Sequence, residues 1–450
     1  MTQLSTAAAL PKGSGPSGAP DIVIAAGLRS AWARAGGAFR GEDAGHLGAR
    51  VARELLARTA LDPAAIDEVI VGCVGPPHDQ ANVARVIGLR AGIPRHVPAR
   101  TVARNCASGI EAVTSAVASI RAGEGELYLT LGVEVMSAYP LIFGEKMTRL
   151  FAGLAGARSL GARLSALTKF RPSFLKPRIA LMEGLTDPVS GLIMGSTAEL
   201  IARDFGLTRA ECDRYALMSH QRATRARDNG RFEREILPVM PLGAKPGQDA
   251  LLHDDSIRDD LNLEKLGRLR PYFEKPDGVV TVGNACGITD GAGALIVTTS
   301  ERAKRHGLQP LARIKGYAWA GCDPARMGLG PVYATARLLD ATGVKLSDIG
   351  HIEINEAFAA QVLGCARAFE SGTFASKELC RTGPVGALDM SRVNTNGGAI
   401  ALGHPVGATG ARLLLTAAHE LAVGDHELSL ATLCIGGGQG GAVLLERIGA

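Results

Sequence analysis

Three features are scarce in this 450-residue sequence: aromatic residues, long apolar runs and paired cysteines. Aromatic residues make up 4% of the chain, and no apolar run is long enough to cross a membrane. With no nucleic-acid motif beside them, so few aromatic residues argue against DNA or RNA binding. None of the eight cysteines forms a Cys-x-x-Cys pair, so we expect no structural zinc site and no other metal site.

The two ends of the sequence carry no targeting signal that we recognise. The first residues, "MTQLSTAAAL", lack the basic start and apolar stretch of a secretory signal and the arginines of a transit peptide. The last residues, "IGA", are not a peroxisomal targeting signal. We therefore expect a cytoplasmic protein with free thiols. Residues 1–20 contain a Pro/Gly/Ser-rich stretch and are predicted to be a disordered tail.

Apolar residues and local charge are what the sequence does contain. Apolar residues make up 46% of the chain, which is enough for a large core, and the length predicts two or three domains. Residues 141–190 carry eight Lys or Arg against three Asp or Glu, while the remaining 41 basic and 41 acidic residues cancel. The net charge of +5 therefore belongs to one basic segment of an otherwise neutral chain.

Two parts of the chain are similar to each other. Residues 61–74 resemble residues 344–357, and residues 106–137 resemble residues 403–437, with small residues at a helix start, a helix, a glycine turn and a strand. Valine- and leucine-rich strands between such helices predict buried sheets with helices on their faces. The internal duplication therefore predicts two similar α/β domains packed as a pseudo-symmetric pair.

The segment between these parts, residues 139–282, has a different pattern. Its first half contains apolar residues at helical spacing, and Thr208 is a plausible cap for a further helix. This segment is predicted to be a mainly helical insertion or lid. The apolar positions form two stripes, one of Met147, Leu150, Phe151 and Leu154 and one of Leu160, Leu164 and Leu167.

Cys106 lies in the stretch "RNCASG" at the predicted start of a helix. Backbone N–H groups and the helix dipole stabilise negative charge there, which predicts a lowered thiol pKa and a nucleophilic cysteine. The small residues after Cys106 leave room for a substrate. A structural cysteine at a helix start is the alternative interpretation.

His404 lies in the glycine-dense stretch "NTNGGAIALGHPVGATG". A neighbouring imidazole can hold a thiol proton and so raise the thiolate fraction of a cysteine. The surrounding glycines favour close approach of the backbone. The alternative is a hydrogen-bonded structural histidine.

Asn355 and Cys434 each lie at the end of a predicted buried strand. Asn355 opens "NEAFA" at a strand end, where α/β proteins place functional residues. It could hold a water or an oxyanion, or serve only as a helix N-cap. Cys434 opens "CIGGGQGG", whose bare N–H groups suit an oxyanion hole, and a second thiol could act as a proton shuttle.

Taken together, these stretches resemble the thiolase family. The family pattern has a nucleophilic Cys, an Asn-Glu-Ala-Phe block, a Gly-His-Pro block and a C-terminal Cys-x-Gly-Gly-Gly block, and all occur here in order. The stretches "MGSTAEL" and "GNACGITDGAGAL" also match, so the resemblance covers nearly the whole chain past residue 20. It implies the α/β thiolase fold, with duplicated domains layered α-β-α-β-α and a mainly helical loop domain.

On this fold the N-terminal domain would cover residues 21–138 and continue at about 283–305. The loop domain would cover residues 139–282, and the C-terminal domain residues 306–450.

The resemblance also implies a role for each site residue. Cys106 would carry the acyl group as a thioester, His404 would activate Cys106, and Cys434 would move the α-proton of the acetyl-CoA unit. His404 and a water held by Asn355 would form one oxyanion hole, and the backbone N–H groups of Cys106 and Gly436 the other. The residues implied near CoA or substrate are Cys286, Met194 and Ile193.

The reaction implied is CoA-dependent cleavage of a 3-ketoacyl-CoA to acetyl-CoA and a shortened acyl-CoA, with the reverse Claisen condensation, in fatty acid β-oxidation. Coenzyme A and acyl-CoA would be substrates, with no permanently bound cofactor. A homodimer or homotetramer is expected.

Three departures from the family pattern refine this expectation. Family members often have Ser at the position of Cys286, and short-chain biosynthetic members often have His at the position of Ile193. The basic insert is most like the thiolase β-subunit of the fatty-acid-oxidation multienzyme complex, although that subunit often has His at the position of Asn355. We therefore predict activity on medium or long 3-ketoacyl-CoAs.

The basic segment at residues 141–190 has two predicted partners besides a solvated role near CoA phosphates. One is the hydratase/dehydrogenase α-subunit of a β-oxidation complex, and the other is an anionic membrane surface. The known complexes of the family favour the protein partner.

Three other functions are alternatives to the predicted 3-ketoacyl-CoA thiolase activity. The first is an acetyl-CoA C-acetyltransferase that makes acetoacetyl-CoA. The second is a β-ketoacyl synthase, but those enzymes lack a C-terminal catalytic cysteine such as Cys434. The third is a non-catalytic thiolase-like lipid-binding protein, which would be expected to have lost Cys106, His404 or Cys434.

Overall fold

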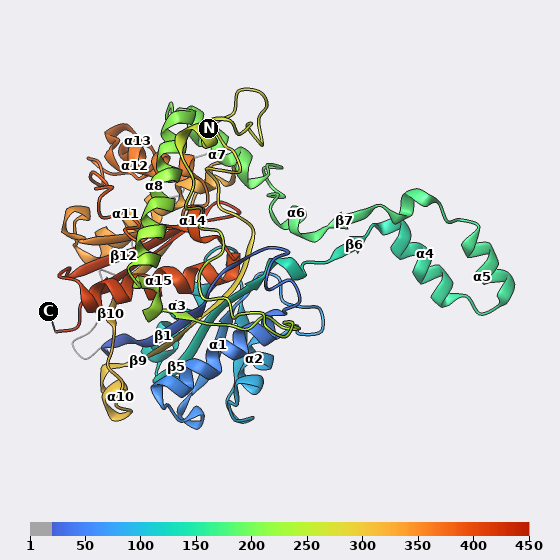
Figure 1. Ribbon diagram of the computed structural model, residues 1–450, viewed down its shortest axis with the longest axis horizontal. Coiled ribbons are helices and arrows are strands. Elements are labelled where there is room, and N and C mark those ends of the chain that lie inside the picture. The colour runs from blue at the N-terminus through green and yellow to red at the C-terminus, as the bar shows by residue number, and fades with distance from the viewer. Residues whose placement is uncertain (1–19, 450) are drawn as a thin grey trace.

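The computed structural model describes residues 20–449 (Figure 1). The disordered tail predicted for residues 1–20 lies, apart from Pro20, outside them. The fold is mixed α/β and is built on one eleven-stranded sheet, whose main strand order is β11-β12-β13-β10-β1-β9-β5-β3-β4. The predicted fold class is therefore confirmed.

The sheet consists of two halves. The first half contains β1 (Ile22–Ser30), β3 (Glu68–Gly72), β4 (Ala99–Val102), β5 (Leu127–Val135) and β9 (Thr289–Thr299), with the short β2 (Ala33–Arg34) and β8 (Ile236–Leu237). The second half contains β10 (Ala312–Gly321), β11 (His351–Ile354), β12 (Leu428–Ile435) and β13 (Gln439–Glu446).

The two halves repeat one pattern of strand pairing. In the first half β3 is parallel to β5, β5 is antiparallel to β9, and β9 is antiparallel to β1. In the second half β11 is parallel to β12, β12 is antiparallel to β13, and β13 is antiparallel to β10. β1 and β10 pair antiparallel, with Val23 opposite Arg313, and join the halves into one sheet. The duplication predicted from the sequence is thus visible in the topology.

Helices fill three layers around the sheet. α1 (Ala44–Thr59) and α2 (Val83–Ala91) pack on the outer face of the first half. α3 (Ser108–Ala122) and α15 (Val406–Val423) pack against each other between the two halves. α11 (Gly330–Thr342) packs on the outer face of the second half, next to α12 (Ala359–Glu370) and α13 (Gly372–Glu378) (Figure 1).

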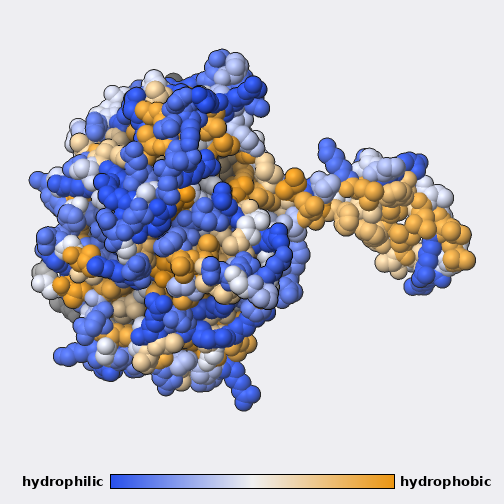
Figure 2. Space-filling model, viewed as in Figure 1, coloured by the Kyte–Doolittle hydropathy of each residue, from blue (hydrophilic) through white to orange (hydrophobic). Residues whose placement is uncertain are grey.

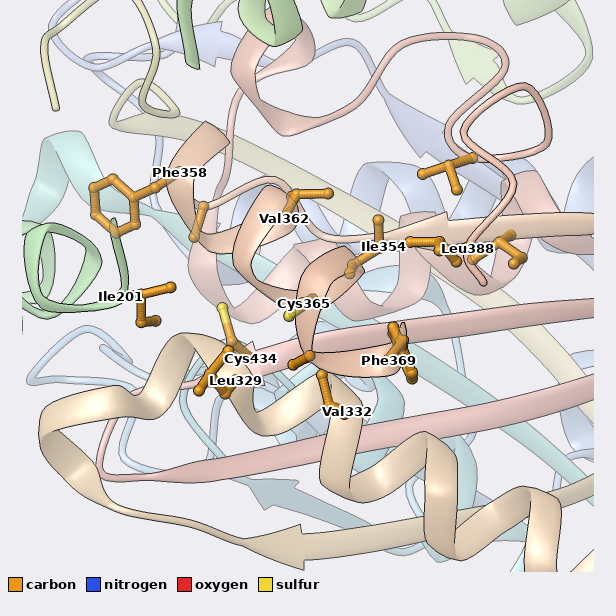
Figure 3. Packing of buried hydrophobic residues seen from close by; sticks show 14 of the residues in the cluster. Ile201, Leu329, Val332, Ile354, Phe358, Val362, Cys365, Phe369, Leu388 and Cys434 are labelled. Carbon is orange, nitrogen blue, oxygen red and sulfur yellow. The ribbon is translucent and has the colours of Figure 1, made fainter. Parts of the chain in front are cut away.

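Each layer boundary has its own hydrophobic cluster, because side chains on a strand alternate between its two faces. On β12, Ala431, Leu433 and Ile435 face the central cluster with α3 and α15. Leu430 and Cys434 face the outer cluster with α11 and α12. Figure 3 shows Cys434 in this outer cluster, with Leu329 and Cys365 among the labelled side chains around it. Cys434 is therefore placed by the alternation of its strand.

The segment between the halves consists of several helices and a projecting hairpin. α7 (Met194–Asp204), α8 (Arg209–Asp228) and α9 (Leu263–Gly267) belong to it, and α8 starts with the predicted cap Thr208 in a full capping box. The remaining short helices are α10 (Ser300–Arg305), α14 (Ala399–Leu402), η1 (Pro63–Ala65), η2 (Met136–Ala138), η4 (Arg231–Arg234), η5 (Pro324–Leu329) and η6 (Leu346–Asp348).

The hairpin at residues 141–179, here called the arm, stands away from the rest of the molecule, here called the body (Figure 1). Its stem is the two-stranded pair β6 (Leu141–Phe143) and β7 (Pro177–Ile179). Its far part contains α4 (Glu145–Gly156), α5 (Leu160–Leu167) and η3 (Pro172–Leu175), and α6 (Ala180–Gly184) leads back to the body.

Within residues 20–449, no helix combines the length and the apolar character needed to span a bilayer. The domain boundaries given above stay predictions.

Candidate active site

A cavity of about 380 Å³ brings together residues from both halves of the chain and from the segment that follows the arm. Cys106, His404, Cys434 and Gly436 all line it. Cys286 and Met194, the predicted substrate contacts, line it as well. Ile193 precedes α7 as its N-cap, outside the set of lining residues, and Asn355 lies behind His404. The contacts of Cys286, Met194 and Ile193 with substrate stay predictions.

Cys106 lies on a tight turn just before α3. Asn105 has a left-handed backbone with φ of 44°, and its side-chain amide donates to the Gly436 carbonyl oxygen at 2.8 Å. The sulfur of Cys106 accepts a hydrogen bond from the backbone N–H of Gly436. Burial nevertheless raises the pKa of the Cys106 thiol, because desolvation outweighs these hydrogen bonds. The prediction of a lowered thiol pKa is therefore wrong, and Cys106 needs a base to become a thiolate.

His404 is oriented by its neighbours on both ring nitrogens. Its side chain is buried, and its Nδ1 lies 2.6 Å from the hydroxyl oxygen of Thr409. That hydroxyl is also 3.0 Å from the Pro405 carbonyl oxygen, to which it donates. With its proton used there, Thr409 accepts from Nδ1–H, and the lone pair of Nε2 faces the Asn355 amide nitrogen at 3.5 Å.

Burial lowers the pKa of His404 to about 4, with the positive charge of Arg412 as a second cause. The imidazole is therefore neutral at neutral pH and is able to accept a proton on Nε2.

Asn355 and Glu356 fix the segment that follows β11. Asn355 is fully buried, and among residues 20–449 its side-chain oxygen has no hydrogen-bond partner. The Glu356 carboxylate accepts hydrogen bonds from Tyr215 at 2.9 Å, Ser219 at 2.7 Å and the Asn394 amide at 2.7 Å. α12 starts only at Ala359, so the alternative that Asn355 caps this helix is wrong.

Cys434 is the last residue but one of β12, lines the cavity and is 1% exposed. Burial holds the pKa of its thiol well above the usual range, and the nearby thiols of Cys106, Cys365 and Cys286 raise it further. The turn after it joins β12 to β13. In this turn Gly438 has φ of 80°, and a side chain on it would run into the Cys322 carbonyl oxygen. The glycines therefore let this turn lie directly against neighbouring backbone.

Glu134, which was not among the predicted site residues, connects three separate segments at the cavity by hydrogen bonds. This buried carboxylate on β5 accepts from the backbone N–H groups of Val74 and Gly75, each at 3.0 Å, and of Gly407 at 2.9 Å. It also accepts from the Tyr139 hydroxyl at 2.9 Å, just before the arm. The signal in the sequence was a lone acid in the apolar strand "LYLTLGVEV".

The segment that follows the arm contributes apolar side chains to the wall of the cavity. Leu181 of α6, and Leu185 and Val189 after it, line the same cavity as the thiols and the imidazole. This wall places the predicted insertion beside the reactive groups.

Comparison with known proteins identifies the family to which this chain belongs. The family model described as thiolase, N-terminal domain, matches residues 22–301, and the one described as thiolase, C-terminal domain, matches residues 308–447. The chain belongs to the thiolase family and is an acyltransferase of that family, as the resemblance implied.

Several relatives are similar over almost their whole length. An acetyl-CoA acetyltransferase of Pseudomonas aeruginosa is 41% identical over 95% of this chain and 99% of its own. A 3-ketoacyl-CoA thiolase of Pectobacterium carotovorum is 38% identical over 94% of this chain and 96% of its own. The solved human mitochondrial 3-ketoacyl-CoA thiolase superposes with a TM-score of 0.83 at 35% identity, over 95% of this chain and 99% of that chain.

Proposed function

We propose that this thiolase cleaves a 3-ketoacyl-CoA with CoA to give acetyl-CoA and a shortened acyl-CoA, and that it catalyses the reverse condensation. One observation carries the proposal. A single cavity joins a thiol that accepts a backbone N–H bond, a neutral imidazole and a second thiol. The relative from Pectobacterium carries the name of this activity, and the human mitochondrial enzyme has been solved in complex with CoA.

In the first half-reaction, His404 takes the proton of the Cys106 thiol on Nε2. The thiolate attacks the C3 ketone of the substrate, and the oxyanion is held by the backbone N–H groups of Cys106 and Gly436. The C2–C3 bond then breaks, and its electron pair goes to C2. Cys434 gives its proton to C2, so that acetyl-CoA leaves and the shortened acyl group stays on Cys106 as a thioester.

In the second half-reaction, the Cys434 thiolate takes the proton of the incoming CoA thiol. The CoA sulfur attacks the thioester carbonyl, and Cys106 leaves and recovers its proton from His404. In the enolate step, protonated His404 and a water held by Asn355 stabilise the thioester oxygen of the acetyl unit. Thr409 keeps the second proton of His404 on Nδ1 throughout.

The test separates the two thiols. Cys106→Ala should abolish acyl-enzyme formation, whereas Cys434→Ala should still be acylated but should lose carbon–carbon bond cleavage. Intact-mass spectrometry after acetyl-CoA treatment measures the adduct, and Cys380→Ala, an exposed cysteine outside the cavity, is the control. An adduct that persists in Cys106→Ala and is lost in Cys434→Ala would reverse the two roles.

We further propose medium or long 3-ketoacyl-CoAs of β-oxidation as substrates. The apolar wall of Leu181, Leu185 and Val189 supports this choice, because an acyl chain gains free energy from apolar contact. The second candidate is synthesis of acetoacetyl-CoA, which the name of the Pseudomonas relative favours. Values of kcat/KM over a ladder of 3-ketoacyl-CoAs decide, and a collapse beyond the four-carbon substrate would favour the second candidate.

We also propose a homodimer or homotetramer, a hydratase/dehydrogenase α-subunit as protein partner, a cytoplasmic location and no permanently bound cofactor. Light scattering of the purified protein measures the oligomer. Pull-down from native lysate tests for the α-subunit.

A further inference from the structure

The arm exposes apolar side chains that the body would bury. Figure 2 shows apolar residues over much of the visible surface of the arm. Within α5 no residue is buried, and every residue of β6 and β7 is exposed. An apolar surface of this kind marks a docking site rather than a solvated face. The exposed large apolar residues of the arm are Leu141, Ile142, Phe143, Phe151, Leu160, Leu164, Leu167, Leu175 and Ile179.

The arm is also strongly positive. It carries all eight basic residues of the segment at 141–190 and a single acid, Glu145. Glu145 pairs with Arg149, and Arg178 pairs with Glu183 at the start of the body. The six other basic side chains have no acidic partner in the part of the chain that the structure describes. They are Lys146, Arg158, Arg163, Lys169, Arg171 and Lys176.

The helices of the arm separate these two kinds of side chain. At helical spacing, Leu150, Phe151 and Leu154 share one side of α4, on which Leu150 is buried and Phe151 is exposed. Arg149 falls on the other side, and Lys146, one turn before Leu150, lies at the edge of the apolar side. The three leucines of α5 likewise share one face, with Arg163 at its edge. This is the pattern of helices that lie in the plane of a lipid surface, with leucines inserted and basic residues at the headgroups.

The charge of the arm selects lipid over protein as its occupant. A protein groove would have to be apolar and acidic at once, and lysine is depleted at protein interfaces. Three of the six unpaired basic residues are lysines. A bilayer with anionic headgroups supplies hydrocarbon and diffuse negative charge together, and each basic residue near it raises affinity roughly fivefold.

We propose that the arm is a docking element for an anionic lipid surface. Because α6 follows directly on the arm and lines the cavity, a docked arm would hold the cavity close to the bilayer. Long acyl chains partition into bilayers, so this position would bring substrate and site together. That last consequence rests on the proposed function, whereas the docking itself does not.

The test is co-sedimentation of the full chain with vesicles of phosphatidylcholine, with or without phosphatidylglycerol, at low and moderate salt. We expect binding to the anionic vesicles only, weakened by salt. The variant Leu160→Asp/Leu164→Asp/Leu167→Asp should lower the vesicle partition coefficient at least tenfold. Its matched control is Leu89→Asp/Leu252→Asp/Val423→Asp, which changes three exposed apolar residues on the body and should bind like the unmodified chain.

All six side chains are about half exposed or more, and the control set is somewhat less exposed. The exposures are 74%, 56% and 51% for the three leucines of the arm, and 47%, 50% and 52% for the three control residues.

A second variant, Lys146→Gln/Arg163→Gln/Lys169→Gln, should bind more weakly and lose most of its salt dependence. Cys106→Ala should bind vesicles like the unmodified chain, which keeps failure of the catalytic proposal apart from failure of this one. No vesicle binding, or equal binding by the arm leucine variant and the unmodified chain, would overturn the proposal. So would capture of a protein partner through these leucines by a chain that does not bind vesicles.

Discussion

The body and the arm are built from similar apolar residues but place them differently. In the body, the strands alternate their side chains between layers, so that residues such as Leu430 and Leu433 are buried on opposite faces of one strand. In the arm, two short helices and a two-stranded stem provide no second layer, and Leu160 and Leu164 stay exposed. Periodicity therefore predicts which face is apolar, whereas the surrounding layers decide whether that face is covered by the chain itself.

The largest expected effect comes from breaking the close packing of the body. A side chain on Gly440 of β13 would overlap the backbone of Gly330, which starts α11. Because backbone on both sides cannot move aside, Gly440→Ala should cost about 3 kcal/mol or more, or prevent folding. Urea unfolding of the purified variant measures the free energy. A midpoint equal to that of the unmodified chain would contradict this packing.

The next effect concerns a side chain that the body holds in one orientation. Thr409→Val keeps the shape but removes the oxygen that accepts from His404 Nδ1–H. We expect kcat to fall roughly 10- to 100-fold with little change in KM, because the imidazole loses its preferred tautomer. Thr409→Ser should restore most of the activity. The nitrogen chemical shifts of His404 report the tautomer directly, and unchanged shifts in Thr409→Val would rule out this role.

Acid should lower the stability of the body through its buried histidines. The arm should lack this effect, since it contains no histidine. Burial lowers the pKa of His404 and of His220 to about 4 in the folded chain. The unfolded chain binds protons at these histidines below about pH 6.5, where the folded chain does not. Stability should therefore fall as the pH drops from about 6.5 toward 4, by about 1 kcal/mol per pH unit for each histidine.

Melting temperatures across this pH range, with His404→Gln and His220→Gln for comparison, measure the contribution of each histidine. Equal slopes in the unmodified chain and in both variants would contradict it.

The smallest expected effect comes from a glycine of the arm that, unlike Gly440, has open space around it. Gly153 lies inside α4, and a side chain on it would meet nothing within 4 Å. Gly153→Ala should therefore stabilise this helix by about 0.5–1 kcal/mol, the ordinary difference in helix propensity. Hydrogen exchange should slow roughly threefold in α4, while the melting temperature of the body stays unchanged. Slower exchange in the body would mean that the arm and the body unfold together.

Local patterns in the sequence were sufficient for the elements and motifs around the site. Glycines after Cys434 predicted the turn between two buried strands, and Thr208 predicted the start of α8. The pKa of Cys106 was predicted in the wrong direction because its burial depends on distant segments, which no local motif records. Glu134 was missed for the same reason, since its partners at 74–75, 139 and 407 are far apart in the sequence.

The pairing of β1 with β10 has a mechanical consequence. It makes the two halves parts of one hydrogen-bonded sheet, while α3 and α15 pack directly against each other beneath the joint. A hinge at this joint would have to break sheet hydrogen bonds and open the central cluster. The halves therefore behave as one stiff frame, and the distance between the thiols that they carry is fixed at folding. Any movement that admits substrate to the cavity is then left to segments outside this frame, such as the short helix α6 that leads back from the arm.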